Sequence, residues 1–207
     1  MTTTQNADSQ ASMTADQALE TLMEGNRRFR DNKRLDRNLL KQVEDTRGGQ
    51  WPFAVVLSCV DSRASAELLF DAGIGDIFSA RVAGNIVNED MLGSIEFATK
   101  VAGAKLVMVL GHTHCGAVKG ACDDVQMGNL TALLSKLRPA VEATSTPGER
   151  NSQNAQLVQD VAVKNVEMAL DSLRERSEVL RELESAGQIR LIGAMYDIEN
   201  GGVELLG

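Results

Sequence analysis

Two short apolar runs constrain the fold of this chain more than any other feature. Residues 53–58 read FAVVLS and residues 105–110 read KLVMVL. Runs without a polar face are typical of strands that are buried on both sides of a parallel sheet. The chain between the runs is long enough for helical crossovers, which keep such strands parallel. The sequence therefore predicts an α/β fold with a central, mostly parallel β-sheet flanked by helices.

Metal-binding side chains follow both runs. Cys59 comes directly after the first run, and His112 and Cys115 follow the second run after Gly111. The carboxyl ends of parallel strands lie at one edge of a sheet, where open α/β folds bind their ligands. Thiolates and imidazoles suit zinc, and a site with three protein ligands leaves the fourth position open. Cys59, His112 and Cys115 are therefore predicted to form a catalytic Zn²⁺ site.

An acid and a base stand close to the first of these ligands. Asp61 and Arg63 lie two and four residues after Cys59, so a turn can direct both toward the metal. A guanidinium holds a carboxylate in bidentate geometry and keeps it ionised. Two thiolates offset the charge of the metal, so the acidity of a zinc-bound water depends on neighbouring groups. We predict that Asp61, held by Arg63, is a fixed hydrogen-bond acceptor for the proton of a zinc-bound hydroxide and so orients it.

Two further residues are interpreted as lying outside the metal site. His114 is a competing ligand by residue type, but the spacing favours His112 and leaves His114 facing a cleft or solvent. Cys122 is interpreted as a structural thiol, because a buried cysteine is more often a small core side chain than a ligand. The same applies to Cys59 taken alone, and it is the combination of spacings that favours a metal.

Taken together, these motifs resemble those of the β-class carbonic anhydrases. The resemblance covers about residues 16–204. It rests on Cys-x-Asp-x-Arg at 59–63 and Gly-His-x-x-Cys-Gly at 111–116, extended by the blocks at 22–29, 70–76 and 81–85. The order and spacing of the five blocks are specific, whereas either zinc fragment alone would only be suggestive.

The resemblance implies an activity and a role for each matching residue. It implies a zinc enzyme that reversibly hydrates carbon dioxide to bicarbonate and a proton, by attack of a zinc-bound hydroxide. Cys59, His112 and Cys115 match the zinc ligands, and Asp61 with Arg63 matches the catalytic dyad. Backbone N–H groups near Gly116 are expected to orient the substrate oxygens.

Two positions depart from the pattern of this family. Ala72 stands where many relatives have a glutamine that helps to position the substrate across a subunit interface. Val56 stands where a bicarbonate-inhibited subset has a tryptophan, so that kind of regulation is not expected. Two other functions stay open: hydrolysis of carbonyl sulfide or carbon disulfide on the same scaffold, and a non-catalytic, zinc-stabilised protein that binds bicarbonate or a partner.

Composition limits the partners and the compartment. The chain has 207 residues, 43% of them hydrophobic, which is enough for one substantial core. Its net charge of −8 argues against nucleic acid and anionic membranes as partners. No apolar run approaches the length of a membrane span. Three cysteines without a disulfide framework fit a reducing compartment, and we expect a cytoplasmic protein.

The remaining patterns divide the chain into a tail and one domain. Residues 1–14 are predicted to be a disordered tail, and residues 15–207 a single domain. Thr14 and Gln17 form a capping box that begins an N-terminal helical arm. In the family such an arm typically wraps a second subunit, so a homodimer or homotetramer is expected. Further strands are predicted at 77–82 and 189–196. Helices are predicted at 64–75 (with a turn), 90–101, 118–122 and 129–141, and two more within 153–185. A turn is predicted at 200–201.

Overall fold

A five-stranded sheet forms the centre of the molecule. The computed structural model describes residues 4–207. The strands are β1 (Ala54–Ser58), β2 (Ile77–Arg81), β3 (Leu106–His112), β4 (Arg190–Tyr196) and β5 (Val203–Leu205). Their order across the sheet is β2-β1-β3-β4-β5. The first four strands are parallel, and β5 returns antiparallel to β4. The predicted α/β class and the strands at both apolar runs are thereby confirmed.

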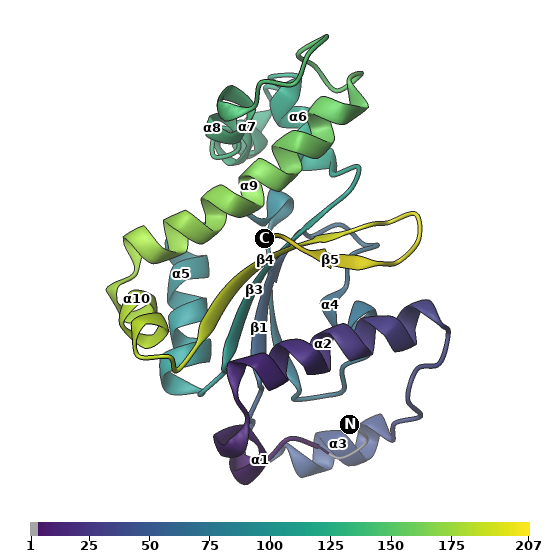
Figure 1. Cartoon of the computed structure of the whole chain (residues 1–207), viewed down its shortest axis with the longest axis vertical. Helices are drawn as coiled ribbons and strands as arrows, with labels where there is room; N and C mark the ends of the chain where they lie inside the picture. The colour runs from purple at the N-terminus through teal and green to yellow at the C-terminus, as the bar shows by residue number, and fades with distance from the viewer. Residues whose placement is uncertain (1–3) are drawn as a thin grey trace.

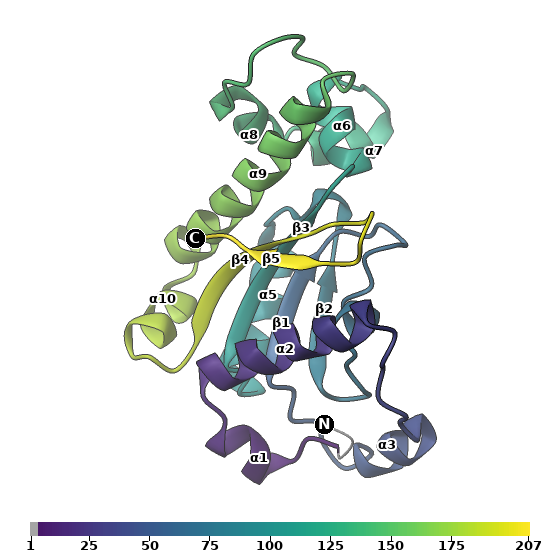
Figure 2. The ribbon, with the colours of Figure 1, turned by 45° about the vertical axis from the view of Figure 1, so that its right-hand side comes forward.

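Helices cover both faces of this sheet (Figures 1 and 2). Successive strand residues point to opposite faces, so Val56 and Met108 pack on one side, and Val55 and Val107 pack on the other. The first side is covered by α2 (Ala15–Arg30) and α4 (Ala66–Leu69). The second side is covered by α5 (Glu89–Glu96), the π-helical η2 (Phe97–Val101), α9 (Ala155–Arg176) and α10 (Glu178–Ser185). Beyond the carboxyl ends of the strands lie η1 (Ala83–Asn85), α6 (Gly116–Cys122), α7 (Gly128–Leu134) and α8 (Arg138–Ala143), of which α6 and α8 pack on α9.

The N-terminal segment differs from the predicted disordered tail at 1–14. Residues 1–3 lie outside the described part of the chain, but Ala7–Ser12 forms a helix, α1. Its Gln10 side chain is only 8% exposed and donates to the backbone oxygens of Pro52 and Ala102, both at 2.7 Å. A polar composition does not reveal such anchoring, because the two carbonyl groups lie 42 and 92 residues away. The capping box of Thr14 and Gln17 that begins α2 is present as predicted.

The helices differ from the prediction at three other places. The polar segment that precedes β1 contains a helix, α3 (Leu39–Asp45), with Asn38 as its N-cap. The helix predicted over 129–141 is divided into α7 and α8 by a turn at 135–137. The predicted helix at 64–75 is shorter, because only Ala66–Leu69 is helical. The two helices predicted within 153–185 are confirmed as α9 and α10.

Candidate metal centre

The parallel pairing of β1 and β3 brings the three predicted zinc ligands together. Ser58, the last residue of β1, is in register with Leu110 of β3, and Cys59 follows it. His112 is the last residue of β3, and Cys115 comes immediately before α6. The two sulfur atoms and an imidazole nitrogen lie within 4.8 Å of one another, and all three side chains are buried. This spacing of soft ligand atoms suits one Zn²⁺ ion.

The orientation of His112 also suits a metal. Its Nδ1 atom lies 2.9 Å from the carbonyl oxygen of Thr113. A carbonyl oxygen can only accept a hydrogen bond, so Nδ1 carries the proton and Nε2 has a free lone pair. Nε2 is buried and has no hydrogen-bond partner within residues 4–207. A buried polar atom is rarely left unpaired, and a metal ion would satisfy it.

The two thiols differ in their affinity for protons. A hydrogen bond from Cys115, together with one from the backbone N–H of Gly84, lowers the pKa of Cys59. The same bond to Cys59, followed by burial, raises the pKa of Cys115. Two adjacent sulfurs therefore share one proton, because two buried thiolates repel each other. A divalent cation removes this repulsion and binds thiolates, which agrees with a metal at this position.

Asp61 and Arg63 form a bidentate ion pair beside these ligands. Arg63 Nε donates to Asp61 Oδ1 at 2.9 Å, and Arg63 Nη2 donates to Asp61 Oδ2 at 2.8 Å. The hydrogen bonds from Arg63 hold the pKa of Asp61 well below its usual range, although partial burial acts in the opposite direction. Asp61 Oδ2 lies 3.9 Å from His112 Nε2. An ionised, oriented carboxylate therefore borders the candidate metal position.

Comparisons with known proteins agree with this geometry. Residues 54–203 match the family model described as carbonic anhydrase. The chain is 33% identical over 190 residues to carbonic anhydrase 2 of Mycobacterium tuberculosis, with 89% of each chain covered. It is 35% identical over 192 residues to a carbonic anhydrase of Mycolicibacterium smegmatis, with 91% of each covered. The chain belongs to the β-carbonic anhydrase family. A tetrameric β-carbonic anhydrase of Sordaria macrospora has a similar structure, with a TM-score of 0.70, 25% identity and coverage of 79% of this chain and 85% of that one.

The other predicted site residues of this carbonic anhydrase lie as follows. Gly116 is the first residue of α6, and a side chain there would meet no atom within 4 Å. Gly116 is exposed and lies directly after the buried Cys115. His114 has a left-handed backbone (φ 56°), and its Nε2 lies 3.1 Å from a carboxylate oxygen of the exposed Glu199. Cys122 is buried in α6. Neither His114 nor Cys122 belongs to the ligand cluster, as predicted.

Two supporting residues were not identified from the sequence. Arg81, at the end of β2, donates to the backbone oxygens of Cys59 at 3.0 Å and Asp61 at 2.6 Å, which fixes the loop that carries both. Asn165 of α9 is 6% exposed and donates to the carbonyl oxygen of Gly84 at 2.9 Å. The N–H of Gly84 in turn donates to Cys59 Sγ at 3.3 Å. A polar residue within the apolar stripe of α9 was the available signal for Asn165.

Ala72 and Val56 are both accounted for by packing. Val56 is fully buried in the centre of β1, and Ala72 is half-buried against the core on the side of α2. Neither side chain can donate a hydrogen bond.

Among the described residues, no helix combines the length and the apolarity that crossing a membrane requires.

Proposed function

We propose that this carbonic anhydrase uses a zinc ion held by Cys59, His112 and Cys115 to hydrate carbon dioxide reversibly to bicarbonate. One observation carries the proposal: a buried Cys-His-Cys cluster with an unpaired imidazole nitrogen lies next to an ionised Asp61. Zinc, when bound in a site with three protein ligands, lowers the pKa of water and so supplies a nucleophile at neutral pH.

The chain's own residues prepare this site for the reaction. Thr113 holds the proton of His112 on Nδ1, which directs the Nε2 lone pair to the metal position. Gly84 donates to the sulfur of Cys59, and a hydrogen bond of this kind stabilises a thiolate. All three ligand side chains are buried, which limits the access of bulk solvent to them.

Asp61 is proposed to accept a hydrogen bond from the attacking oxygen. Its carboxylate is fixed by two hydrogen bonds from Arg63 and one from the Arg63 backbone, so it cannot rotate freely. A fixed acceptor can hold the attacking oxygen with a lone pair directed at the carbon of the substrate. We propose that the backbone N–H of Gly116, an exposed residue at the start of α6, orients a substrate oxygen. No cofactor besides zinc is required.

A homodimer or homotetramer is proposed for the assembled enzyme. Strand β2 is at the edge of the sheet, and Phe97, whose ring lies 6.1 Å from that of Phe78 in β2, is 50% exposed. An unpaired edge beside exposed apolar side chains is typical of a surface that a second subunit covers. The similar protein of Sordaria macrospora is described as tetrameric. The three cysteines are free thiols, which supports a reducing, cytoplasmic location.

Stopped-flow hydration of carbon dioxide tests the function. The zinc-loaded protein would be measured at neutral and at moderately alkaline pH, together with Asp61→Asn and with Asp31→Asn as a matched surface control. We expect wild-type activity, a fall of about 10²–10⁴-fold in Asp61→Asn, and no change in the control. Full activity in Asp61→Asn would show that the carboxylate has no such role.

Absence of hydration by the zinc-loaded wild type at both pH values would contradict the proposed substrate. Carbonyl sulfide and carbon disulfide would then be tested with the same protein, because the same site could polarise these linear molecules. If neither reacts, calorimetric binding of bicarbonate would test the non-catalytic alternative.

A further inference from the structure

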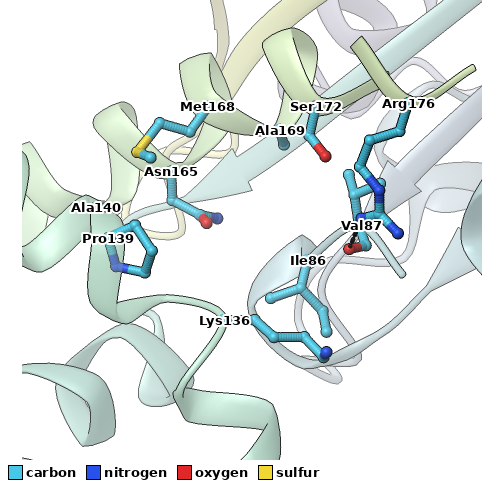
Figure 3. A pocket seen from close by; sticks show the side chains of 10 residues that line it. All are labelled: Ile86, Val87, Lys136, Pro139, Ala140, Asn165, Met168, Ala169, Ser172 and Arg176. Atoms are coloured by element: carbon cyan, nitrogen blue, oxygen red, sulfur yellow. Dashed lines mark hydrogen bonds between the residues drawn. The ribbon is translucent and has the colours of Figure 1, made fainter. Parts of the chain in front are cut away.

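A cavity beside η1, lined by none of the candidate zinc ligands, has the composition of a small-molecule site. It lies between α8, α9 and the segment that follows η1 (Figure 3), and its volume is about 260 Å³. Asp61 and Arg63 do not line it either. Pockets for drug-sized ligands typically have volumes of about 300–1,000 Å³, so this cavity suits a smaller molecule.

Most of the cavity wall is apolar. Ile86 and Ala140 are buried at 4% and 2% exposure, and Ala169 is buried at 5%. Val87 and Met168 add further apolar surface. Such a wall binds a short aliphatic or single-ring body through its surface area.

The charged groups of the cavity are both cationic. Lys136 and Arg176 line it, and no aspartate or glutamate does. Arg176 donates to the backbone oxygen of Val87 at 3.1 Å and pairs at 3.1 Å with Glu89, whose side chain is 87% exposed. Lys136 has no acidic partner within 4.0 Å in the part of the chain that the structure describes. Lys136 is exposed to solvent at the mouth of the cavity, and no acidic side chain there neutralises its charge.

Two neutral polar groups point into the same space. The hydroxyl of Ser172 and the amide of Asn165 are directed into the cavity (Figure 3). Asn165 is 6% exposed, and its Nδ2 is used by the hydrogen bond to Gly84. Its Oδ1 makes no hydrogen bond with any residue from 4 to 207 and stays free to accept one. The hydroxyl of Ser172 can donate to an anionic ligand, whereas Asn165 Oδ1 can only accept, so selectivity for an anion rests on Lys136 and Ser172.

From this combination we propose that the cavity binds a small monocarboxylate with a short apolar body. The single unneutralised cation selects one negative charge, and the apolar wall excludes a fully hydrated inorganic anion. The occupant would lie against Asn165, where the hydrogen-bonded path through Gly84 to Cys59 begins. The site is nevertheless separate from the zinc ligands in its lining residues.

Methyl NMR on the full-length, zinc-loaded protein tests the site, with benzoate as the probe. We expect saturable shifts at the methyl groups of Ile86, Val87, Ala140 and Ala169. Lys136→Gln is expected to weaken binding about tenfold, because hydrogen bonds to charged groups contribute most of the selectivity. Lys100→Gln removes an exposed lysine that does not line the cavity, and it should bind benzoate as the wild type does.

Two further measurements keep the test independent of zinc chemistry. Ser172→Leu, which fills the cavity from a half-buried position, should abolish the same shifts while leaving zinc content unchanged. Benzyl alcohol, the neutral analogue, should bind at least about tenfold more weakly than benzoate. Shifts confined to methyl groups around Cys59, equal binding of benzyl alcohol, or unchanged affinity in both cavity variants would each overturn the proposal.

Discussion

At the scale of single residues, Arg63 sets the charge of Asp61. Its bidentate hydrogen bonds lower the pKa of Asp61, so the carboxylate is ionised at neutral pH. In Arg63→Gln the side-chain hydrogen bonds are removed, and the pKa of Asp61 should rise toward its usual range, although the backbone N–H of residue 63 still donates to the carboxylate. Carboxyl ¹³C shifts of the zinc-loaded proteins would measure this. Identical titration of Asp61 in both proteins would contradict the assignment.

Arg63→Gln should also reduce kcat/KM, because the carboxylate loses its fixed orientation. We expect a smaller effect than in Asp61→Asn, since the Asp61 carboxylate is still present as the hydrogen-bond acceptor. Arg27→Gln serves as a control, because Arg27 is exposed and forms only a surface pair with Glu24 at 3.6 Å.

At the scale of elements, the contact between α2 and the end of α4 depends on one glycine. A Cβ atom on Gly25 would lie 1.8 Å from the backbone oxygen of Phe70, and no side-chain rotation can relieve that overlap. Gly25→Ala should therefore destabilise the protein by about 3 kcal/mol. Denaturant unfolding would measure the change.

The matched control is Gly93→Ala in the middle of α5. Gly93 is exposed, and an added Cβ would meet nothing within 4 Å. Alanine has a higher helix propensity than glycine, so this variant should gain about 0.5–1 kcal/mol of stability. Equal effects of the two substitutions would show that α2 does not pack as closely as described.

The packing of the N-terminal arm also depends on a buried carboxylate. The side chain of Asp71 is fully buried and accepts hydrogen bonds from Arg28 Nε at 2.7 Å and Arg37 Nη1 at 2.6 Å. Burial alone would raise its pKa, but the hydrogen bonds from these arginines and from the Leu35 N–H lower it overall. The folded-state pKa is therefore below the unfolded value of about 3.9. Asp71 stabilises the fold above that value, and the contribution is lost as the pH falls through the folded-state pKa.

Asp71→Asn should consequently be less stable than the wild type by about 3–5 kcal/mol at neutral pH, since the arginines lose their buried counter-charge. As the pH falls into the acidic range, the free energy of unfolding of Asp71→Asn should also decline less steeply than that of the wild type. Asparagine tolerates the left-handed backbone of this position (φ 44°), so the substitution tests charge rather than backbone strain. Asp31→Asn, on an exposed pair with Lys33, should change stability by less than about 0.5 kcal/mol. Parallel pH curves for wild type and Asp71→Asn would exclude this linkage.

At the scale of the whole molecule, zinc is expected to stabilise the folded chain. The three ligand atoms come together only when β1 and β3 are paired, so the unfolded chain lacks the site. At a free zinc concentration 100-fold above Kd, binding would add about 2.7 kcal/mol. For a chain of this size that corresponds to a rise in Tm of about 5–10 °C.

Calorimetry and metal analysis of two cysteine variants would test this. Cys122→Ala removes a buried thiol outside the cluster and should keep one zinc ion and the shift in Tm. Cys115→Ala should lose both. Retention of zinc by Cys115→Ala would show that the metal is held elsewhere.

The sequence by itself determined the four parallel strands of the sheet and the three residues of the candidate metal cluster, whereas the antiparallel β5 was not predicted. Buried strands need continuous apolar, β-branched runs, and the residues that end those runs, Cys59 and His112, must then lie at one edge. The capping box at Thr14 and the turn at Gly201 were also readable, because they are local patterns. The helix around Gln10 was not, since a polar segment reveals no anchor when its partners are remote in sequence.

Only the tertiary structure decided which residues support the site and where a second site lies. The hydrogen bond between Asn165 and Gly84 spans 81 residues, and the one between Arg81 and the backbone of Cys59 spans 22. The cationic cavity likewise requires Lys136, shortly before α8, and Arg176, at the end of α9, to face the same space. Local patterns encode the period of a helix and the end of a strand. They do not encode the distance between helices, which depends on how side chains pack across the sheet.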